Sequence, residues 1–286
     1  MENMAKGREC MTYRKAFSLG ESVLEKANIA DAKNDAWLLL AMACKVDHTF
    51  YYMHVDEEMP EEQAHEYEVL IRKRAEHVPL QYITGEQEFM GLNFNVNSNV
   101  LIPRQDTETL VEEALKVAKP GMKILDMCTG SGCVLISIMK NVHGVEGFGY
   151  DISKQAINVA KDNAKLNDVS AVFERSNLFE DVMDEHFDMI VSNPPYIKTA
   201  EIAELMPEVA EFEPIEALDG KEDGLYFYRE IIEKCVDYLT DEGYLLFEIG
   251  YDQADDVSAM LKNAGFLDVR VQKDLAGNDR VVMGHL

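Results

Sequence analysis

The segment Asn193-Pro194-Pro195-Tyr196 carries polar groups that could bind and orient an amide or an amine. It follows the apolar run 187–192, which is typical of a buried parallel strand, and two prolines without N–H groups cannot continue that strand. Pro195 also holds Pro194 in an extended conformation. A stiff turn therefore presents the Asn193 amide and the Pro194 carbonyl, with the Tyr196 ring beside them for a planar group. The alternative is a turn that only terminates the strand.

A second candidate site is the segment 126–132, Asp-Met-Cys-Thr-Gly-Ser-Gly, between an expected strand and an expected helix. Glycines there let the backbone approach a ligand and leave helix N–H groups exposed. Asp151 lies 21 positions after Gly130, where a carboxylate can accept hydrogen bonds from ribose hydroxyls. The alternatives are a strand-end cap for Asp126 and a helix N-cap for Asp151.

The same loop departs from two common nucleotide motifs. Leu135 stands where the dinucleotide pattern Gly-x-Gly-x-x-Gly needs its last glycine, and no lysine stands where a phosphate-binding loop needs one. An aspartate before the loop suits a cofactor with an ammonium group, such as the methionyl part of S-adenosylmethionine. The carboxyl ends of strands in an open α/β sheet are where such folds bind ligands.

Strands and helices are expected to alternate around these loops. The expected strands are 123–127, 147–150, 171–173, 189–191, 243–248, 268–271 and 280–283, and the expected helices are 106–118, 134–142, 154–166, 222–239 and 254–264. This order predicts a mostly parallel sheet with helices on both faces. Between Gln87 and Leu101 the alternation predicts a β-hairpin that turns at Gly91.

The chain before the hairpin has helical spacing over residues 12–77. The apolar segment 35–42 predicts the centre of a small bundle with Trp37 in its core. Asp31 and Asp47 are candidate helix N-caps, and residues 79–85 are expected to form a linker.

The charge is strongly negative, because 53 acidic residues face 27 basic ones and the net charge is −26. Proteins that bind DNA or RNA neutralise phosphates with Lys and Arg, so a nucleic-acid substrate is disfavoured. The sequence has no apolar run of the roughly 18 residues that a membrane span needs, and its first residues lack the apolar part of a secretory signal. Its five cysteines (Cys10, Cys44, Cys128, Cys133 and Cys235) lack metal-ligand spacing and are expected to be free thiols.

Together, the loop 126–132, Asp151 and the segment 193–196 resemble the S-adenosylmethionine-dependent methyltransferases that carry an Asn-Pro-Pro-Tyr motif. Three upstream segments make the chain similar to the release factor glutamine methyltransferases (HemK-like family): Pro-Leu-Gln-Tyr-Ile-Thr-Gly at 79–85, Glu-Phe-Met-Gly at 88–91 and Val-Leu-Ile-Pro-Arg at 100–104. The resemblance covers nearly the whole chain from about Thr12.

The resemblance implies a Rossmann-like class I methyltransferase domain with a mostly parallel seven-stranded sheet, and a small helical bundle joined to it by the hairpin. It divides the chain into a substrate-recognition domain (1–84), a linker with the hairpin (85–103) and a cofactor-binding catalytic domain (104–286). It implies methylation of the glutamine side-chain amide in the Gly-Gly-Gln motif of class 1 peptide chain release factors. S-adenosylmethionine would be the cofactor and S-adenosylhomocysteine its product.

The same resemblance implies roles for individual residues. The catalytic residues would be Asn193, Pro194 and Tyr196; the cofactor would contact Asp126, Cys128, Thr129, Gly130, Ser131, Gly132, Asp151, Asn177, Leu178 and Asn193; and Asn193, Pro194, Pro195, Tyr196 and Phe89 would bind the glutamine. Phe89 has the alternative of being a core residue of the hairpin. The sequence departs from the family pattern at three places. Cys128 replaces a glycine, so the turn must tolerate a side chain or use a negative φ; Asn177 replaces an aspartate; and Gln105-Asp106 replaces a Pro-Glu pair.

The expected chemistry depends on orientation, because the lone pair of a carboxamide nitrogen is delocalised into its carbonyl. The Asn193 side-chain oxygen and the Pro194 carbonyl would each accept one N–H of the glutamine and aim its nitrogen at the methyl donor. A protein substrate, no nucleic acid, no membrane, no metal and a cytoplasmic monomer are expected. The alternatives are a ribosomal-protein glutamine methyltransferase, an adenine-N6 methyltransferase of DNA or RNA, which the charge disfavours, and a binding module without catalysis, which the intact motif disfavours.

Overall fold

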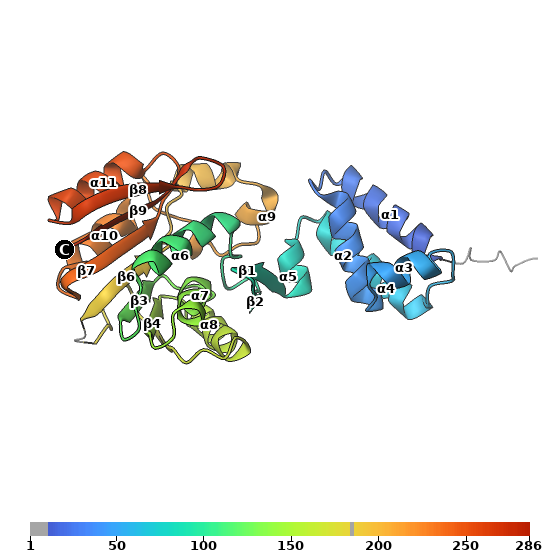
Figure 1. Cartoon of the computed structure of the whole chain (residues 1–286). Helices are drawn as coiled ribbons and strands as arrows, with labels where there is room; N and C mark the ends of the chain where they lie inside the picture. Colours follow the sequence, from blue (N-terminus) through green and yellow to red (C-terminus); the bar gives the residue numbers. More distant parts are fainter. Residues whose placement is uncertain (1–10, 184–185) are drawn as a thin grey trace, which may run out of the picture. The chain divides into compact units, whose positions relative to one another are not determined.

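The structure is a computed structural model that describes residues 11–183 and 186–286. The chain forms two compact units, one ending at Thr84 and the other starting at Gly85 (Figure 1). Within the described ranges, no helix has both the length and the apolar character needed to cross a membrane. Cys44, Cys128, Cys133 and Cys235 form no disulfide, and Cys10 lies outside the described residues.

The first unit is helical, as its spacing predicts. Its helices are α1 (Tyr13–Lys26), α2 (Ala32–Cys44), α3 (His48–His54), α4 (Glu61–Ala75) and α5 (Leu80–Thr84). The Asp47 carboxylate caps α3 by accepting from the Phe50 N–H at 2.8 Å, whereas Asp31 makes no capping hydrogen bond. Trp37 is only partly buried and stacks on His48. The linker expected at 79–85 is wrong, because its residues 80–84 form α5.

The second unit contains the predicted hairpin, β1 (Glu86–Phe89) paired with β2 (Leu92–Asn95), and a sheet of seven strands. The sheet strands are β3 (Lys123–Met127), β4 (Glu146–Asp151), β5 (Val172–Arg175), β6 (Phe187–Ser192), β7 (Leu239–Glu248), β8 (Leu267–Lys273) and β9 (Asp279–His285). Their order is β5-β4-β3-β6-β7-β9-β8, and only the pairings of β9 are antiparallel. The mostly parallel seven-stranded sheet is therefore confirmed.

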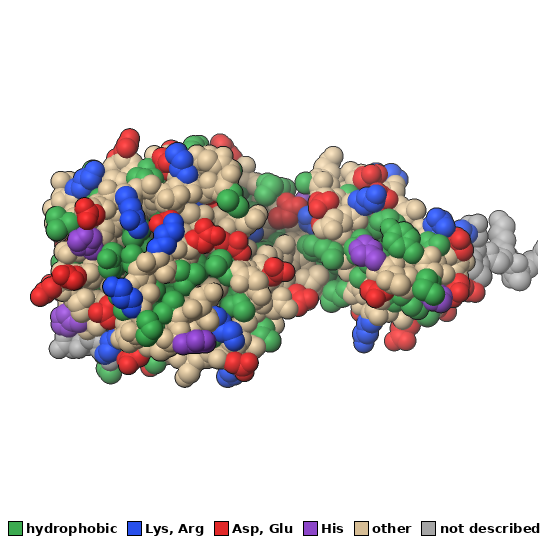
Figure 2. Space-filling model, in the orientation of Figure 1, with side chains coloured by type: hydrophobic (Ala, Val, Ile, Leu, Met, Phe, Trp, Pro, Cys, Tyr) green, Lys and Arg blue, Asp and Glu red, His purple; other side chains and the backbone are tan. Residues whose placement is uncertain are grey.

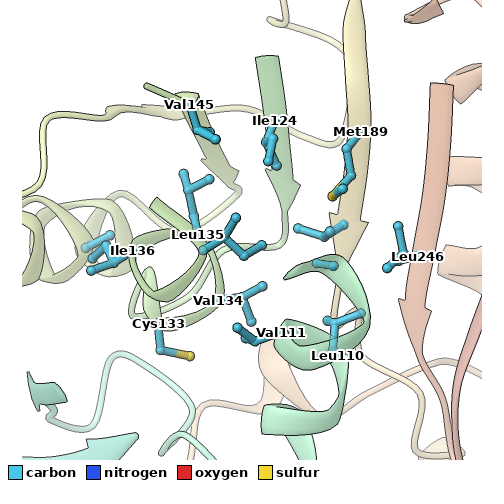
Figure 3. Close-up of a cluster of buried hydrophobic side chains, with 14 of the residues drawn as sticks. Leu110, Val111, Ile124, Cys133, Val134, Leu135, Ile136, Val145, Met189 and Leu246 are labelled. Carbon is cyan, nitrogen blue, oxygen red and sulfur yellow. The ribbon is translucent and has the colours of Figure 1, made fainter. Parts of the chain in front are cut away.

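Helices cover both faces of this sheet, because successive strand residues point to opposite sides. On one face α6 (Gln105–Val117), α7 (Cys133–Asn141) and α8 (Lys154–Leu166) pack with Ile124, Met189 and Leu246. Figure 3 shows α6 and α7 contributing Leu110, Val111, Val134 and Leu135 to this cluster. On the other face α10 (Tyr226–Cys235) and α11 (Ala254–Asn263) pack with Leu125, Ile190 and Leu245.

The segment between β6 and α10 contains three short helices that the sequence pattern did not predict: η1 (Thr199–Glu204), α9 (Pro207–Ala210) and η2 (Ile215–Ala217). Pro207 and Pro214 limit their length, because proline is accepted at the start of a helix but not within it. The helix expected at 222–239 is too long at both ends. Gly224 has φ +75° before α10, and β7 already begins at Leu239.

Candidate active site at the carboxyl edge of the sheet

Three parallel strands bring the polar residues of the second unit to one edge. Met127 at the end of β3 pairs with Ser192 of β6, and Ser192 pairs with Phe247 of β7. The loop after β3, the turn at Asn193 and the last residue of β7, Glu248, therefore share the carboxyl edge. The strand order changes direction between β3 and β6, which is where open α/β sheets bind ligands.

A cavity of about 820 Å³ opens at this edge, within the range of roughly 300–1,000 Å³ that small-molecule sites occupy. Its walls come from the loop after β3, the ends of β4 and β5, the start of α6 and the segment after β6. Arg104 borders it and forms an ion pair with the buried Glu213 of the segment after β6. This ion pair ties that segment to the residue that precedes α6.

The loop after β3 turns sharply under the cavity. Gly130 has φ +53°, and a Cβ at this position would meet no atom within 4 Å, so its backbone borders open space. Gly132 has φ +80°, and a Cβ added there would lie 3.1–3.3 Å from atoms of Ile136, Ala160 and Phe173, so a side chain would be strained and crowded by the core. Cys128 has φ +62°. The turn thus tolerates a side chain at this position, and the alternative of a negative φ is wrong.

Asp126 is buried below the loop and is only 2% exposed. Its carboxylate accepts a hydrogen bond from the Thr129 hydroxyl at 2.6 Å. Burial raises the pKa of Asp126 to about 7, although the Thr129 hydroxyl and the Leu135 N–H oppose that rise. A cationic group in the cavity would favour the ionised form, since an opposite charge lowers the pKa of a carboxyl group.

The raised pKa of Asp126 predicts how stability depends on pH. Between the usual pKa of 3.8 and the folded value of about 7, the folded protein retains a proton that the unfolded chain has released. The free energy of unfolding should therefore fall as pH rises through this window, by on the order of a few kcal/mol. Asp126→Asn removes the titrating group. The difference in melting temperature, wild type minus Asp126→Asn, should therefore decrease as the pH is raised from 4 to 8.

The matched control is Asp162→Asn, which changes an exposed aspartate on α8. The difference in melting temperature between the wild type and Asp162→Asn should show no comparable decrease over the same pH range. If the difference in melting temperature between the wild type and Asp126→Asn, measured without ligand, stayed constant with pH, this would contradict a raised pKa for the buried Asp126 carboxyl group.

Asp151 ends β4 beside the loop. Its Oδ2 accepts from the Gly130 N–H at 2.9 Å and its Oδ1 from the Ser153 N–H at 2.8 Å. Ser153, not Asp151, is the N-cap of α8. The carboxylate thus fixes the glycine turn and lines the cavity, and each oxygen retains a lone pair for a ligand hydroxyl.

The turn after β6 is fixed from two sides. The Asn193 side-chain amide donates to the Thr107 hydroxyl at 3.4 Å, and the Tyr196 hydroxyl donates to Glu248 Oε1 at 3.4 Å. The Tyr196 carbonyl accepts from the buried Gln253 side chain at 3.1 Å. Pro194 and Pro195 are buried, so the turn has little room to rearrange.

Most of the predicted site residues meet at this cavity. Those that line it are Asp126, Cys128, Thr129, Gly130, Ser131, Asp151, Asn177, Leu178, Asn193 and Pro195. Gly132, Pro194 and Tyr196 belong to the same loops but are not among the described lining residues. Phe89 is 1% exposed and packs edge-on against Phe94 in the hairpin core. This placement favours the core alternative for Phe89, so we leave Phe89 out of the site.

Three further residues at the site, Thr107, Glu248 and Gln253, were not predicted from the sequence. Thr107 lies in the first turn of α6 and lines the cavity, while Glu248 and Gln253 are buried next to the turn after β6. A signal existed for Glu248, because a carboxylate at the end of the apolar run Leu-Leu-Phe is unusual in a buried strand. In the described part of the chain, no group of three or more His, Cys, Asp and Glu side chains could hold a metal ion.

Comparison with known proteins finds relatives that are similar to this chain over nearly its whole length. Residues 15–85 match the family described as "PrmC N-terminal domain", and residues 104–211 match "Methyltransferase small domain". The chain is 40% identical over 283 residues to the release factor glutamine methyltransferase of Geobacter sulfurreducens, covering 99% of this chain and 100% of that one. It is 44% identical over 269 residues to the enzyme of the same name from Clostridium botulinum, covering 92% of this chain and 95% of that one.

A solved structure has a similar fold over about two thirds of the chain. A methyltransferase from Pyrococcus furiosus aligns with a TM-score of 0.52 at 16% identity, covering 68% of this chain and 89% of that one. At that level of identity the likeness concerns the fold alone.

Proposed function

We propose, because this chain belongs to the family of release factor glutamine methyltransferases, that its cavity places a glutamine side chain against the methyl donor. The enzyme is an S-adenosylmethionine-dependent protein-glutamine N-methyltransferase. The observation that carries the proposed site is the position of Asn193, which lines the same cavity as Asp126, Gly130 and Asp151.

The residues around the cavity fit this cofactor. S-adenosylmethionine supplies an activated methyl group together with an ammonium, a carboxylate and a ribose. We assign Asp126 to the side of the ammonium, Gly130 to a close backbone approach and Asp151 to the ribose hydroxyls. Asn177 and Leu178, which line the cavity after β5, would flank the adenine.

The turn after β6 would bind the glutamine. The Asn193 amide uses its Nδ2 to donate to Thr107, so its Oδ1 remains to accept one N–H of the substrate. The Pro194 carbonyl would accept the other, and Tyr196 would limit movement of the amide plane. Two fixed acceptors orient the nitrogen, whose proton becomes acidic only as the methyl group is transferred, so no general base is needed beforehand.

Asp151→Ala is expected to weaken cofactor binding by about 1–3 kcal/mol, because the ribose hydroxyls lose a charged acceptor. The loop would also lose the bond that Asp151 accepts from the Gly130 N–H. The cofactor affinity of Asp151→Asn should lie between those of the wild type and Asp151→Ala, since asparagine keeps one acceptor oxygen. Isothermal titration calorimetry measures the affinity, and an unchanged value for Asp151→Ala would contradict the assignment.

The finer substrate assignment is the glutamine of the Gly-Gly-Gln motif in class 1 release factors. The net charge of −26 supports a protein over a nucleic acid, and acidic and basic side chains are interspersed on the face shown in Figure 2. We further propose that the helical first unit recognises the release factor and that the enzyme acts as a monomer in the cytoplasm, where translation terminates.

The test is transfer of labelled methyl groups from S-adenosylmethionine to purified release factor. A release factor whose motif glutamine is replaced by alanine is the control. Label on the natural factor alone is the expected result, whereas equal labelling of both factors would contradict the proposed site of methylation.

A further inference from the structure

A buried carboxylate, Glu248, lies behind the turn that carries Asn193. It is 2% exposed and ends β7, the strand next to β6 in the sheet. Its Oε1 accepts the Tyr196 hydroxyl at 3.4 Å. Its Oε2 is buried without a hydrogen-bond partner among the residues that the structure describes. Buried carboxylate oxygens are rarely left unpaired, so this one needs an explanation.

The surroundings of Glu248 partly compensate its charge. Burial raises its pKa to about 7, while Thr107, Arg280 and Tyr196 oppose that rise. Arg280 is itself paired with Asp274 at 3.1 Å and with Asp106 at 3.3 Å. A well-packed apolar residue at this place would cost the fold less than a buried charge, which indicates a role other than stability.

Thr107 contacts the same turn from the side of α6. Its hydroxyl accepts from Asn193 Nδ2 and has one hydrogen of its own to donate. Thr107 and Glu248 contact the same short turn, Thr107 at Asn193 and Glu248 at Tyr196. Donation from Thr107 to Glu248 Oε2 would give the orphan oxygen a partner and fix the direction of the whole chain of hydrogen bonds.

We propose that Thr107 and Glu248 are positioning residues that set which end of the Asn193 amide faces the substrate. Glu248 holds the hydroxyls of Tyr196 and Thr107, and Thr107 holds the Asn193 NH₂, so that the Asn193 oxygen is the group left for the glutamine. Without these hydrogen bonds the Asn193 amide can rotate and present its own N–H groups to the N–H groups of the substrate. The 3.4 Å contacts are long, as is common at catalytic sites before the substrate is bound.

This inference rests on the proposed function, and Thr107→Val tests it. Valine keeps the volume of threonine and removes the hydroxyl, so kcat with release factor should fall by about 10- to 100-fold, less than for loss of a direct contact. Thr107→Ser keeps the hydroxyl and should restore kcat to near the wild-type value. Thr109→Val, which removes a buried hydroxyl from the same helix, is the matched control and should leave kcat unchanged.

Glu248→Gln is the second variant, because a glutamine of the same shape replaces one of the two acceptor oxygens with an NH₂ group, which cannot accept from a hydroxyl. Its kcat should also fall, while its affinity for S-adenosylmethionine and its melting temperature stay close to those of Thr109→Val. A fall in kcat rather than a rise in KM separates positioning from uniform substrate binding.

The outcomes are distinct. A wild-type kcat in Thr107→Val, or an equal loss of kcat in Thr107→Ser and Thr107→Val, would overturn the positioning role of Thr107 and Glu248. Loss of cofactor affinity in proportion to kcat would do the same, since it would indicate a general structural defect. A wild-type enzyme that transfers no methyl group to release factor would instead contradict the proposed function.

Discussion

Asn193→Ala should lower the turnover number for release factor by about 10²–10³-fold, the usual cost of removing one preorganised hydrogen-bonding group from an active site. The Asn193 oxygen is the acceptor that would orient the glutamine nitrogen, and alanine leaves nothing in its place. Affinity for S-adenosylmethionine should change little, because Asp126, Gly130 and Asp151 line the other parts of the cavity.

Asn193→Asp is the informative companion. It keeps an acceptor but loses the NH₂ that donates to Thr107, and it adds a charge beside the cofactor. We expect impaired turnover here as well, because the turn loses its hydrogen bond to Thr107 and the added charge would attract the positively charged sulfonium of the cofactor. Asn158→Ala, an exposed asparagine on α8, is the control and should behave as wild type.

A strand-ending turn without a catalytic role would give a different pattern. The melting temperature and the cofactor affinity of Asn193→Ala would then both be lower than those of the wild type, and activity would fall only in proportion to these losses. Measuring melting temperature, cofactor affinity and turnover on one preparation separates the two possibilities. A stable and fully active Asn193→Ala would contradict the proposed mechanism.

Removing residues 1–84 should abolish methylation of intact release factor while leaving cofactor binding intact. The residues from Gly85 onward form a compact unit with their own core on both faces of the sheet, and every residue that lines the cavity lies within it. The helical unit has a separate core built from α1, α2 and α4, so it can fold and bind a partner without contributing to the cavity.

The matched experiment uses the helical unit alone. Residues 1–84, added in excess, should compete with the full-length enzyme for release factor and slow its methylation. Full activity of the shortened chain on intact release factor would contradict the recognition role. Loss of its cofactor binding would contradict the independence of the second unit.

The sequence predicted the parts of the fold that depend on local pattern. The strands at Lys123–Met127 and the helix at Lys154–Leu166 match the structure residue for residue, because each has a clear apolar period and a polar boundary. The loop between 199 and 217 was not predicted, since its short helices contain too few residues to show a period. The linker at 79–85 was wrong for the same reason.

The candidate site was predicted as far as motifs extend. Asp126, Asp151 and Asn193 stand at strand ends with a recognisable spacing, and the structure brings all three to one cavity. Thr107 and Glu248 have no such spacing, because they are 141 residues apart by their numbers. Thr107 contacts the turn at Asn193 from α6, and Glu248 contacts it at Tyr196 from β7, which pairs with β6. Contacts of this kind depend on tertiary packing, which local pattern does not encode.

The most direct test of the account is mass spectrometry of release factor after incubation with the enzyme and isotope-labelled S-adenosylmethionine. We expect the mass increase of one labelled methyl group on the peptide that holds the Gly-Gly-Gln motif, with fragmentation placing it on the glutamine side chain. Asn193→Ala should leave that peptide almost unmodified over the same time. A methyl group on another residue, or an unmodified glutamine with the wild-type enzyme, would contradict the account.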